Sequence, residues 1–129
     1  MRILLDTHLL LWATARSRRL PAEARGLLED PANEIHYSAA SLWEIAIKLG
    51  LRRTDFEVDL GLLRATLPDM GFVELPVTGA HAERLVLLPP IHKDPFDRML
   101  VAQSLSEPLV LLTNDGLLAE YGSLVRLVQ

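Results

Sequence analysis

The 129-residue chain contains no cysteine. This absence excludes disulfides, cysteine-based zinc sites and thiol nucleophiles. Lysine is also scarce, because Lys48 and Lys93 are the only two among 13 basic residues, and the net charge is −4 at pH 7. Such a balance excludes a generally basic protein that coats nucleic acid through its overall charge.

Long uncharged apolar segments are lacking as well. The apolar start of the chain is interrupted by Asp6 and His8, and no small-residue cleavage site of a signal peptide follows. No apolar stretch approaches the ~18 residues that are needed to span a bilayer. We therefore expect a cytoplasmic protein with no membrane partner.

The composition that is present is that of a globular domain. Half of the residues are hydrophobic and 23% are charged, which separates the chain from disordered sequences. A chain of this length buries about two thirds of its unfolded surface, which is enough for a core without covalent staples. With no internal repeat or linker, we expect one domain over residues 1–129.

Apolar runs and helical patterns alternate along the chain. Strands are predicted at residues 2–5, 34–38, 72–75, 109–112 and 124–128. Helices are predicted at residues 7–13, 21–30, 39–49, 60–67, 78–88 and 94–106, with a short one after residue 116. Strands separated by helices imply right-handed crossovers and a parallel sheet covered on both faces, which is an α/β fold.

Two acids follow the most apolar predicted strands. Asp6 ends the first strand, and Asp115 follows the strand at 109–112. Each could be a plain helix cap or turn residue. Two acids at the ends of neighbouring strands, ~5 Å apart, instead favour a site, because open α/β sheets bind ligands outside the carboxyl ends of their strands.

Two further acids lie in predicted helices. Glu44 is flanked by Trp43 and Ile45, so it must face water, a partner or a metal, unless it forms a capping box with Ser41. Ser38 is the better cap for that helix, which leaves Glu44 inside it.

Asp97 follows Asp94 by three residues near a helix start. The two could be a capping pair, or Asp97 could join the acidic cluster while Asp94 alone caps the helix.

Several carboxylates that converge on one place need compensation, because like charges raise one another's pKa or recruit cations. Oxygen ligands without cysteine favour Mg²⁺ or Mn²⁺ over zinc, and Mg²⁺ keeps waters that suit phosphate chemistry. The acids therefore indicate a divalent-metal site that acts on a phosphate ester.

Four motifs, taken in order, resemble those of the PIN domain, with particular likeness to the VapC-type toxins of bacterial toxin–antitoxin pairs. The motifs are Asp6-Thr7 after the first strand, Ser41–Lys48, His92–Gln103 with its Asp-Pro-Phe-Asp-Arg block, and Thr113-Asn114-Asp115.

The resemblance implies a three-layer α/β/α sandwich with a central, mainly parallel sheet, and an Mg²⁺- or Mn²⁺-dependent endoribonuclease. It implies an acidic quartet that both holds the metal and performs catalysis: Asp6, Glu44, Asp97 and Asp115. It also implies a hydroxyl at Thr113 that supports the site through water, and inhibition by a cognate VapB-like antitoxin. The hydrophobic composition of so small a domain further suggests a homodimer.

Other residue types carry weaker signals. Two arginine clusters could hold the RNA backbone, although solvated surface arginines are the simpler interpretation: Arg16, Arg18 and Arg19, and Arg52 with Arg53. The four histidines show no metal-binding spacing, which favours packing or surface roles: His8, His36, His81 and His92.

Two alternatives come from other functional classes. An Mg²⁺-dependent phosphoryl-transfer domain also places acids at strand ends, but a phosphatase of this kind needs an acid at the position of His8, and a receiver needs a lysine after Lys93. A non-catalytic interaction module with the same fold is not excluded by the sequence, although an intact acidic quartet argues against it.

Overall fold

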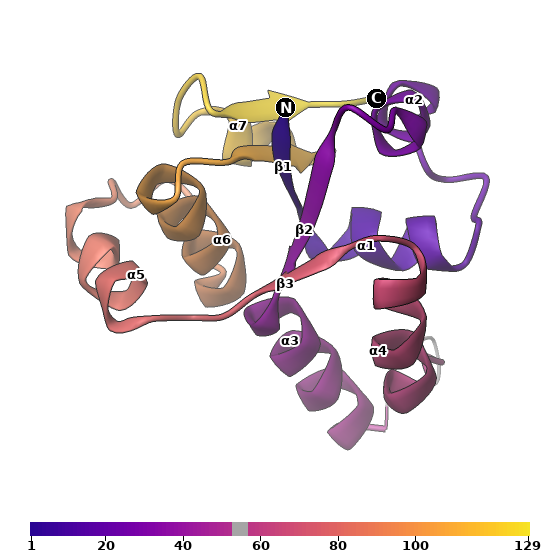
Figure 1. Ribbon diagram of the computed structural model, residues 1–129. Coiled ribbons are helices and arrows are strands. Elements are labelled where there is room, and N and C mark those ends of the chain that lie inside the picture. Colours follow the sequence, from indigo (N-terminus) through magenta and orange to yellow (C-terminus); the bar gives the residue numbers. More distant parts are fainter. Residues whose placement is uncertain (53–56) are drawn as a thin grey trace.

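The computed structural model describes residues 1–52 and 57–129 and contains one five-stranded sheet (Figure 1). The strands are β1 (Arg2–Leu5), β2 (Glu34–Ser38), β3 (Val73–Leu75), β4 (Val110–Thr113) and β5 (Val125–Leu127). Their order is β3-β2-β1-β4-β5, and each pair of neighbours runs parallel. The predicted α/β class is therefore confirmed.

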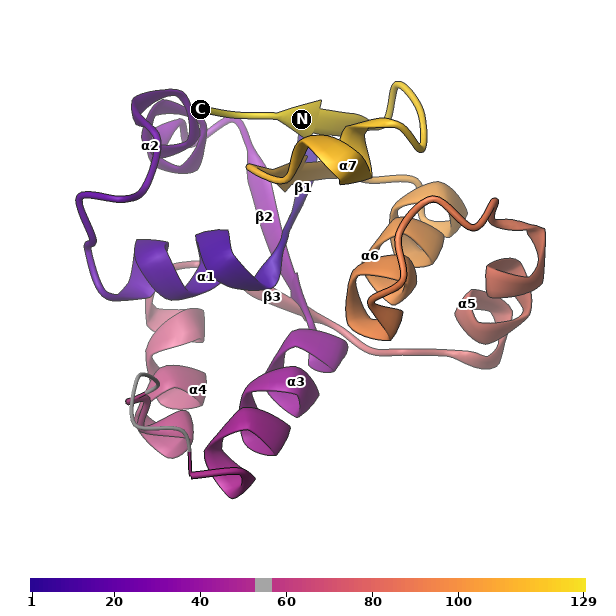
Figure 2. The ribbon, with the colours of Figure 1, turned by 180° about the vertical axis from the view of Figure 1, so that it is seen from behind.

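Helices pack on both faces of this sheet. They are α1 (Thr7–Thr14), α2 (Ala22–Glu29), α3 (Ala39–Gly50), α4 (Leu60–Asp69), α5 (Gly79–Arg84), α6 (Pro95–Ser106) and α7 (Gly116–Ala119), with a 3₁₀ turn at Leu85–Leu87. Helices α1, α2 and α4 lie on one side of the sheet and α5 and α6 on the other, as the two opposite views show (Figures 1 and 2). This arrangement is the expected three-layer sandwich.

The core divides into two clusters because successive side chains of a strand point to opposite faces. In β1, Ile3 and Leu5 join the cluster under α1, α2 and α4, whereas Leu4 joins the cluster under α6. All three are fully buried, as expected for a strand that is covered on both sides.

Two helix ends differ from the sequence prediction. Helix α4 does not stop before Pro68 but includes it in the last turn and ends at Asp69. Pro68 cannot donate to the carbonyl of Arg64, but the N–H of Met70 still donates to the carbonyl of Thr66 at 3.1 Å and closes the last turn. Gly71, with φ of +80°, then reverses the chain. The helix predicted to reach Leu88 instead tightens into the 3₁₀ turn after Arg84, ahead of the two prolines at 89 and 90.

Residues that cap helices line the carboxyl edge of the sheet. Asp6 caps α1 directly after β1, Ser38 caps α3 as the last residue of β2, and Asp115 caps α7 after β4. Asp94 caps α6 by accepting the N–H groups of Phe96 and Asp97 at 2.8 and 3.1 Å. Within the described ranges, no helix has both the length and the apolar character required to cross a bilayer.

Candidate functional site

Asp6 is buried at the end of β1, and we group it with Glu44 as the inner acids. Its side chain is 3% exposed. Oδ1 accepts the N–H of Leu9 at 2.8 Å, and Oδ2 accepts the hydroxyl of Thr113 at 2.6 Å. Burial raises the pKa of Asp6, while these two hydrogen bonds act in the opposite direction. Both oxygens of Asp6 are thus held by the protein.

Glu44 is the second inner acid and projects from α3 into the same region. Its Oε1 accepts the hydroxyl of Thr7 at 2.9 Å, and its Oε2 lies 2.9 Å from Nζ of Lys48, one helical turn further along. Glu44 is 8% exposed. The glutamate therefore does not face open water, because a hydroxyl and an ammonium group engage its two oxygens.

Asp97 and Asp115, the outer acids, are more accessible and are joined by a histidine. Nε2 of His92 lies 3.0 Å from Oδ2 of Asp115 and 3.4 Å from Oδ2 of Asp97. The side chains of Asp97 and Asp115 are 24% and 41% exposed. Asp115 additionally accepts the N–H of Leu117 at 2.9 Å as the cap of α7.

Asp97 is the least compensated acid of the four. Burial, together with the carboxylates of Asp94, Glu44 and Asp6, raises its pKa to about 7, and only His92 opposes them. Asp115 likewise raises the pKa of Asp6. The inner and outer acids therefore share one electrostatic environment, which none of the surrounding cations fully neutralises.

The contact between α3 and α6 fixes this convergence. Trp43, next to Glu44, packs edge-on against Phe96, next to Asp97, with ring centroids 5.1 Å apart and planes at 83°. Such an aromatic pair contributes roughly 0.5–1.5 kcal/mol beyond its buried area. It holds the two helices in the relation that places Glu44 near Asp97.

The donor set fits a hard divalent cation. Carboxylate oxygens dominate the cluster, which is the ligand type that Mg²⁺ and Mn²⁺ prefer. One ligand atom each from His92, Asp97 and Asp115 lies within 4.8 Å of the other two. Asp97, with its raised pKa and its single 3.4 Å contact, is the group that a cation would relieve most.

Comparison with known proteins gives a family that agrees with this geometry. The family model described as the PIN domain matches residues 3–124. The chain belongs to the PIN-domain family. No curated protein sequence matches it.

Solved structures resemble this PIN domain over most of its length. A toxin–antitoxin complex from Klebsiella pneumoniae is 26% identical, with 88% of this chain and 86% of that chain covered and a TM-score of 0.55. VapC20 of Mycobacterium tuberculosis, a sarcin-ricin loop cleaving toxin, is 19% identical, with 96% and 98% covered and a TM-score of 0.65. VapBC2 of Rickettsia felis, bound to a promoter DNA fragment, is 14% identical, with 89% of each chain covered and a TM-score of 0.63.

In this PIN domain, Asp6 and Asp115 are helix caps and also belong to the acidic cluster. Asp6 and Asp115 are both N-caps, so each carboxylate binds free helix N–H groups and also faces the other acids. The cap of α3 is Ser38, as expected, and Ser41 instead lies 2.9 Å from the hydroxyl of Thr7. The capping roles of Asp6 and Asp115 are therefore compatible with membership of an acidic site.

Sequence reasoning missed two features of the cluster. The hydroxyl of Thr113 donates directly to Asp6, while its expected support of the site through water stays a prediction. The interpretation of His92 as a packing or surface residue is wrong, because it bridges the outer acids. The available signal was its position two residues before Asp94, a spacing that lets its ring accept the Asp94 N–H.

The arginines predicted to contact RNA lie apart from the acids. Arg16, Arg18 and Arg19 are exposed in the loop after α1, and α1 separates that loop from Asp6 by about 12 Å. Arg52 is exposed after α3, and Arg53 lies outside the described residues. Their part in RNA binding stays a prediction.

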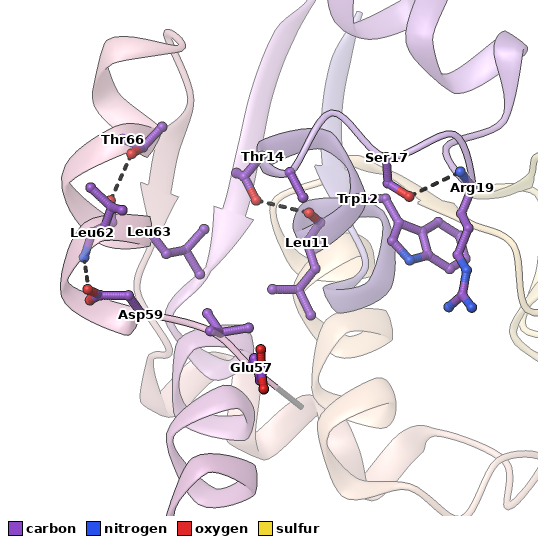
Figure 3. A pocket seen from close by; sticks show the side chains of 12 residues that line it. Leu11, Trp12, Thr14, Ser17, Arg19, Glu57, Asp59, Leu62, Leu63 and Thr66 are labelled. Carbon is purple, nitrogen blue, oxygen red and sulfur yellow. Dashed lines mark hydrogen bonds between the residues drawn. The ribbon is translucent and has the colours of Figure 1, made fainter. Parts of the chain in front are cut away.

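A separate cavity of about 520 Å³ lies between α1 and α4. Figure 3 shows Leu11 and Trp12 of α1 on one side of it, facing Leu62 and Leu63 of α4. Its lining, as far as the chain is described, includes none of the four acids. The cavity is mainly apolar and differs in chemistry from the acidic cluster.

Proposed function

We propose that this PIN domain is a divalent-metal-dependent endoribonuclease and the toxin of a toxin–antitoxin pair. The observation that carries the proposal is Asp97, a carboxylate whose pKa rises to about 7 among three other acids and which has one weak contact. The likeness to the Klebsiella toxin–antitoxin complex and to VapC20, a sarcin-ricin loop cleaving toxin, supports the assignment to this class.

Asp6, Asp97 and Asp115 are the residues that would hold Mg²⁺ or Mn²⁺, with Glu44 beside them. A divalent cation in such a site activates water as a nucleophile and neutralises the charge that develops on the phosphate.

The protein's own contributions are visible in the contacts. Thr113 fixes the orientation of Asp6, and Thr7 and Lys48 fix that of Glu44. The burial of both inner acids excludes bulk water from one side of the cluster, which strengthens every electrostatic interaction there.

RNA and this site are both anionic, so the arginines are proposed to guide the approach. Arg16, Arg18 and Arg19 offer exposed guanidinium groups that can bind phosphates without reading sequence. Arg52 is exposed at the end of α3 and can extend this surface. We propose that water attacks the phosphorus in line with the 3′-oxygen, so that the P–O3′ bond breaks and the products carry a 5′-phosphate and a 3′-hydroxyl.

A VapB-like antitoxin and a second copy of this chain are the proposed protein partners. The apolar cavity between α1 and α4 supports a partner on that side. The exposed apolar side chains on and after α3, Trp43, Ile47 and Leu51, support self-association. Light scattering that finds a soluble monomer at high concentration would count against the homodimer.

Cleavage of RNA by the purified protein is the direct test of the activity. We expect cleavage with Mg²⁺ or Mn²⁺ and none with EDTA. Asp97→Asn should lower the rate by about 100-fold or more, since a metal ion supplies several kcal/mol of transition-state stabilisation and 1.4 kcal/mol is a factor of ten.

Asp69→Asn is the matched control, because Asp69 is an exposed carboxylate at the end of α4 and outside the cluster. Cleavage that continues in EDTA, or full activity of Asp97→Asn, would refute the metal-dependent site. A folded protein that cleaves no RNA under any of these conditions would favour the non-catalytic interaction module.

A further inference from the structure

His92 makes five polar contacts through its backbone and its ring, more than its expected surface role requires. We propose that His92 is a positioning residue that donates its Nε2–H to Asp115 and Asp97 and sets their spacing for a cation without coordinating the cation itself. The inference rests on the proposed function, since it concerns how the same site acquires its metal.

The hydrogen bonds of the ring define its tautomer. The backbone N–H of Asp94 donates to Nδ1 of His92 at 3.1 Å, so Nδ1 carries a lone pair and no proton. The ring proton is then on Nε2, which lies 3.0 Å from Oδ2 of Asp115 and 3.4 Å from Oδ2 of Asp97. Nε2 is therefore a donor to two carboxylate oxygens, which are acceptors.

This tautomer is the opposite of the one that a metal-binding histidine uses. A coordinating imidazole binds the metal with one ring nitrogen and donates the N–H of the other to a carbonyl, carboxylate or water. In His92 the second nitrogen, Nδ1, faces an N–H donor. Coordination through Nε2 would leave the ring without any proton, so the geometry favours hydrogen bonding over coordination even though Nε2 lies among possible ligands.

The backbone of His92 is held as firmly as its ring. Its N–H donates to Oη of Tyr121 at 2.9 Å. The guanidinium of Arg98 donates to the same Tyr121 oxygen at 3.2 Å and lies 3.4 Å from the carbonyl oxygen of His92. Tyr121 and Arg98 therefore fix where the imidazole can reach, independently of the outer acids.

The bridge joins two carboxylates that come from different elements. Asp97 belongs to α6, and Asp115 is the cap of α7. Within the described residues, His92 is the one group that contacts both carboxylates. Two carboxylates repel each other when ionised. A fixed N–H between them lowers this repulsion and leaves their remaining lone pairs for a cation.

Binding of Mn²⁺ to the metal-free protein without RNA tests the proposal by calorimetry. We expect His92→Ala to weaken Mn²⁺ binding by about 10- to 100-fold, the usual cost of losing a group that orients metal ligands. His92→Gln should stay within a few-fold of the wild type, because its amide N–H can reach the same carboxylates. Tyr121→Phe, which removes the acceptor of the His92 N–H, should give a smaller loss than His92→Ala.

Nitrogen-15 NMR of the imidazole separates the donor from the ligand. We expect protonated Nε2 and unprotonated Nδ1 both before and after Mg²⁺ is added. A proton that moves to Nδ1 when Mg²⁺ binds would show coordination and overturn the proposal. This measurement uses the wild type, so it decides the question even if His92→Ala fails to fold.

The two proposals fail in different ways. If the wild-type protein binds Mn²⁺ and His92→Ala binds it equally well, only the role of His92 is refuted. If the wild-type protein binds neither Mn²⁺ nor Mg²⁺, the metal-dependent function is refuted, and the role of His92 falls with it.

Discussion

The inner and outer acids carry the same charge but differ in how the protein treats them. Both oxygens of Asp6 and both oxygens of Glu44 are engaged by protein donors at 2.6 to 2.9 Å. Among the outer acids, Asp115 accepts the Leu117 N–H at 2.9 Å and lies 3.0 Å from Nε2 of His92, whereas Asp97 has a contact of 3.4 Å with the same nitrogen. The difference separates two tasks: the inner acids are anchored in advance, whereas Asp97, the less engaged outer acid, is left to be completed by a cation.

The origin of the difference is local. Thr7, the first residue of α1 and the neighbour of Asp6 in the chain, donates its hydroxyl to Glu44 and so links the two inner acids. Asp97 lies in the first turn of α6, where its own capping residue Asp94 already takes the free N–H groups. Asp94, the cap of α6, thus leaves the side chain of Asp97 without N–H partners, and its own carboxylate repels that of Asp97.

Loss of an anchor of the inner acids should have the largest effect. Thr113→Val removes the hydroxyl that donates to Oδ2 of Asp6 at 2.6 Å and leaves a buried carboxylate oxygen without it. We expect a 10- to 100-fold fall in RNA cleavage and a loss of roughly 1–3 kcal/mol of stability. Cleavage assays and denaturant unfolding measure the two effects.

Thr113→Ser is the control, because it keeps the hydroxyl and removes only a methyl group. It should retain most of the activity. If valine and serine behave alike, the hydroxyl does not orient Asp6 and the anchored character of the inner acids is in doubt.

Asp97 should contribute strongly to the pH dependence of stability in the metal-free protein. Burial and the neighbouring carboxylates raise the pKa of Asp97 from 3.8 to about 7. The folded state therefore holds a proton that the unfolded state releases, so the free energy of unfolding should fall as the pH rises from about 4 to 7.

Chemical denaturation at several pH values in EDTA checks this slope. Asp97→Asn, which cannot ionise, should flatten it, whereas Asp69→Asn should leave it unchanged. A slope that is the same in the wild type and in Asp97→Asn would mean that Asp97 is compensated by contacts like those of the inner acids.

The smallest effect is expected where an inner acid has two supports. Lys48→Met removes the ammonium group from Oε2 of Glu44 and keeps the apolar stem, while Thr7 still donates to Oε1. The pair is partly exposed, with 29% of the Lys48 side chain accessible, so the stability change should stay below about 1 kcal/mol. We expect a fall in cleavage of only a few-fold; a loss as large as that of Thr113→Val would show that Lys48 has a larger role than supporting Glu44.

The sheet was predictable because its signals are local. The apolar runs at β1 and β4 end at acids, and Ser38 and Asp94 cap the following helices as their residue types indicate. The exceptions have the same local origin. Pro68 removes one hydrogen bond near the end of α4, but the Met70 N–H still bonds Thr66, so the helix continued through Pro68 where the residue type alone indicated a stop.

The site was predictable only in part, because its contacts join distant segments. The resemblance to PIN-domain motifs named the four acids, but it could not distinguish anchored from uncompensated ones. That distinction depends on Thr7 meeting Glu44 across 37 positions and on Thr113 meeting Asp6 across 107. The bridging role of His92 likewise depends on the fold, since Asp115 lies 23 positions further along the chain.

The most direct test of whether the outer acids await a cation is the thermal unfolding midpoint with and without Mn²⁺, compared between the wild type and Asp97→Asn. We predict that Mn²⁺ raises the unfolding midpoint of the wild type, because a ligand that binds only the folded state stabilises it. In EDTA, Asp97→Asn should unfold at the same temperature as the wild type or higher, by about 4 °C for each kcal/mol of relieved repulsion, and should gain little from Mn²⁺. An equal Mn²⁺ shift in both proteins, or a lower midpoint of Asp97→Asn in EDTA, would contradict the claim that the outer acids await a cation.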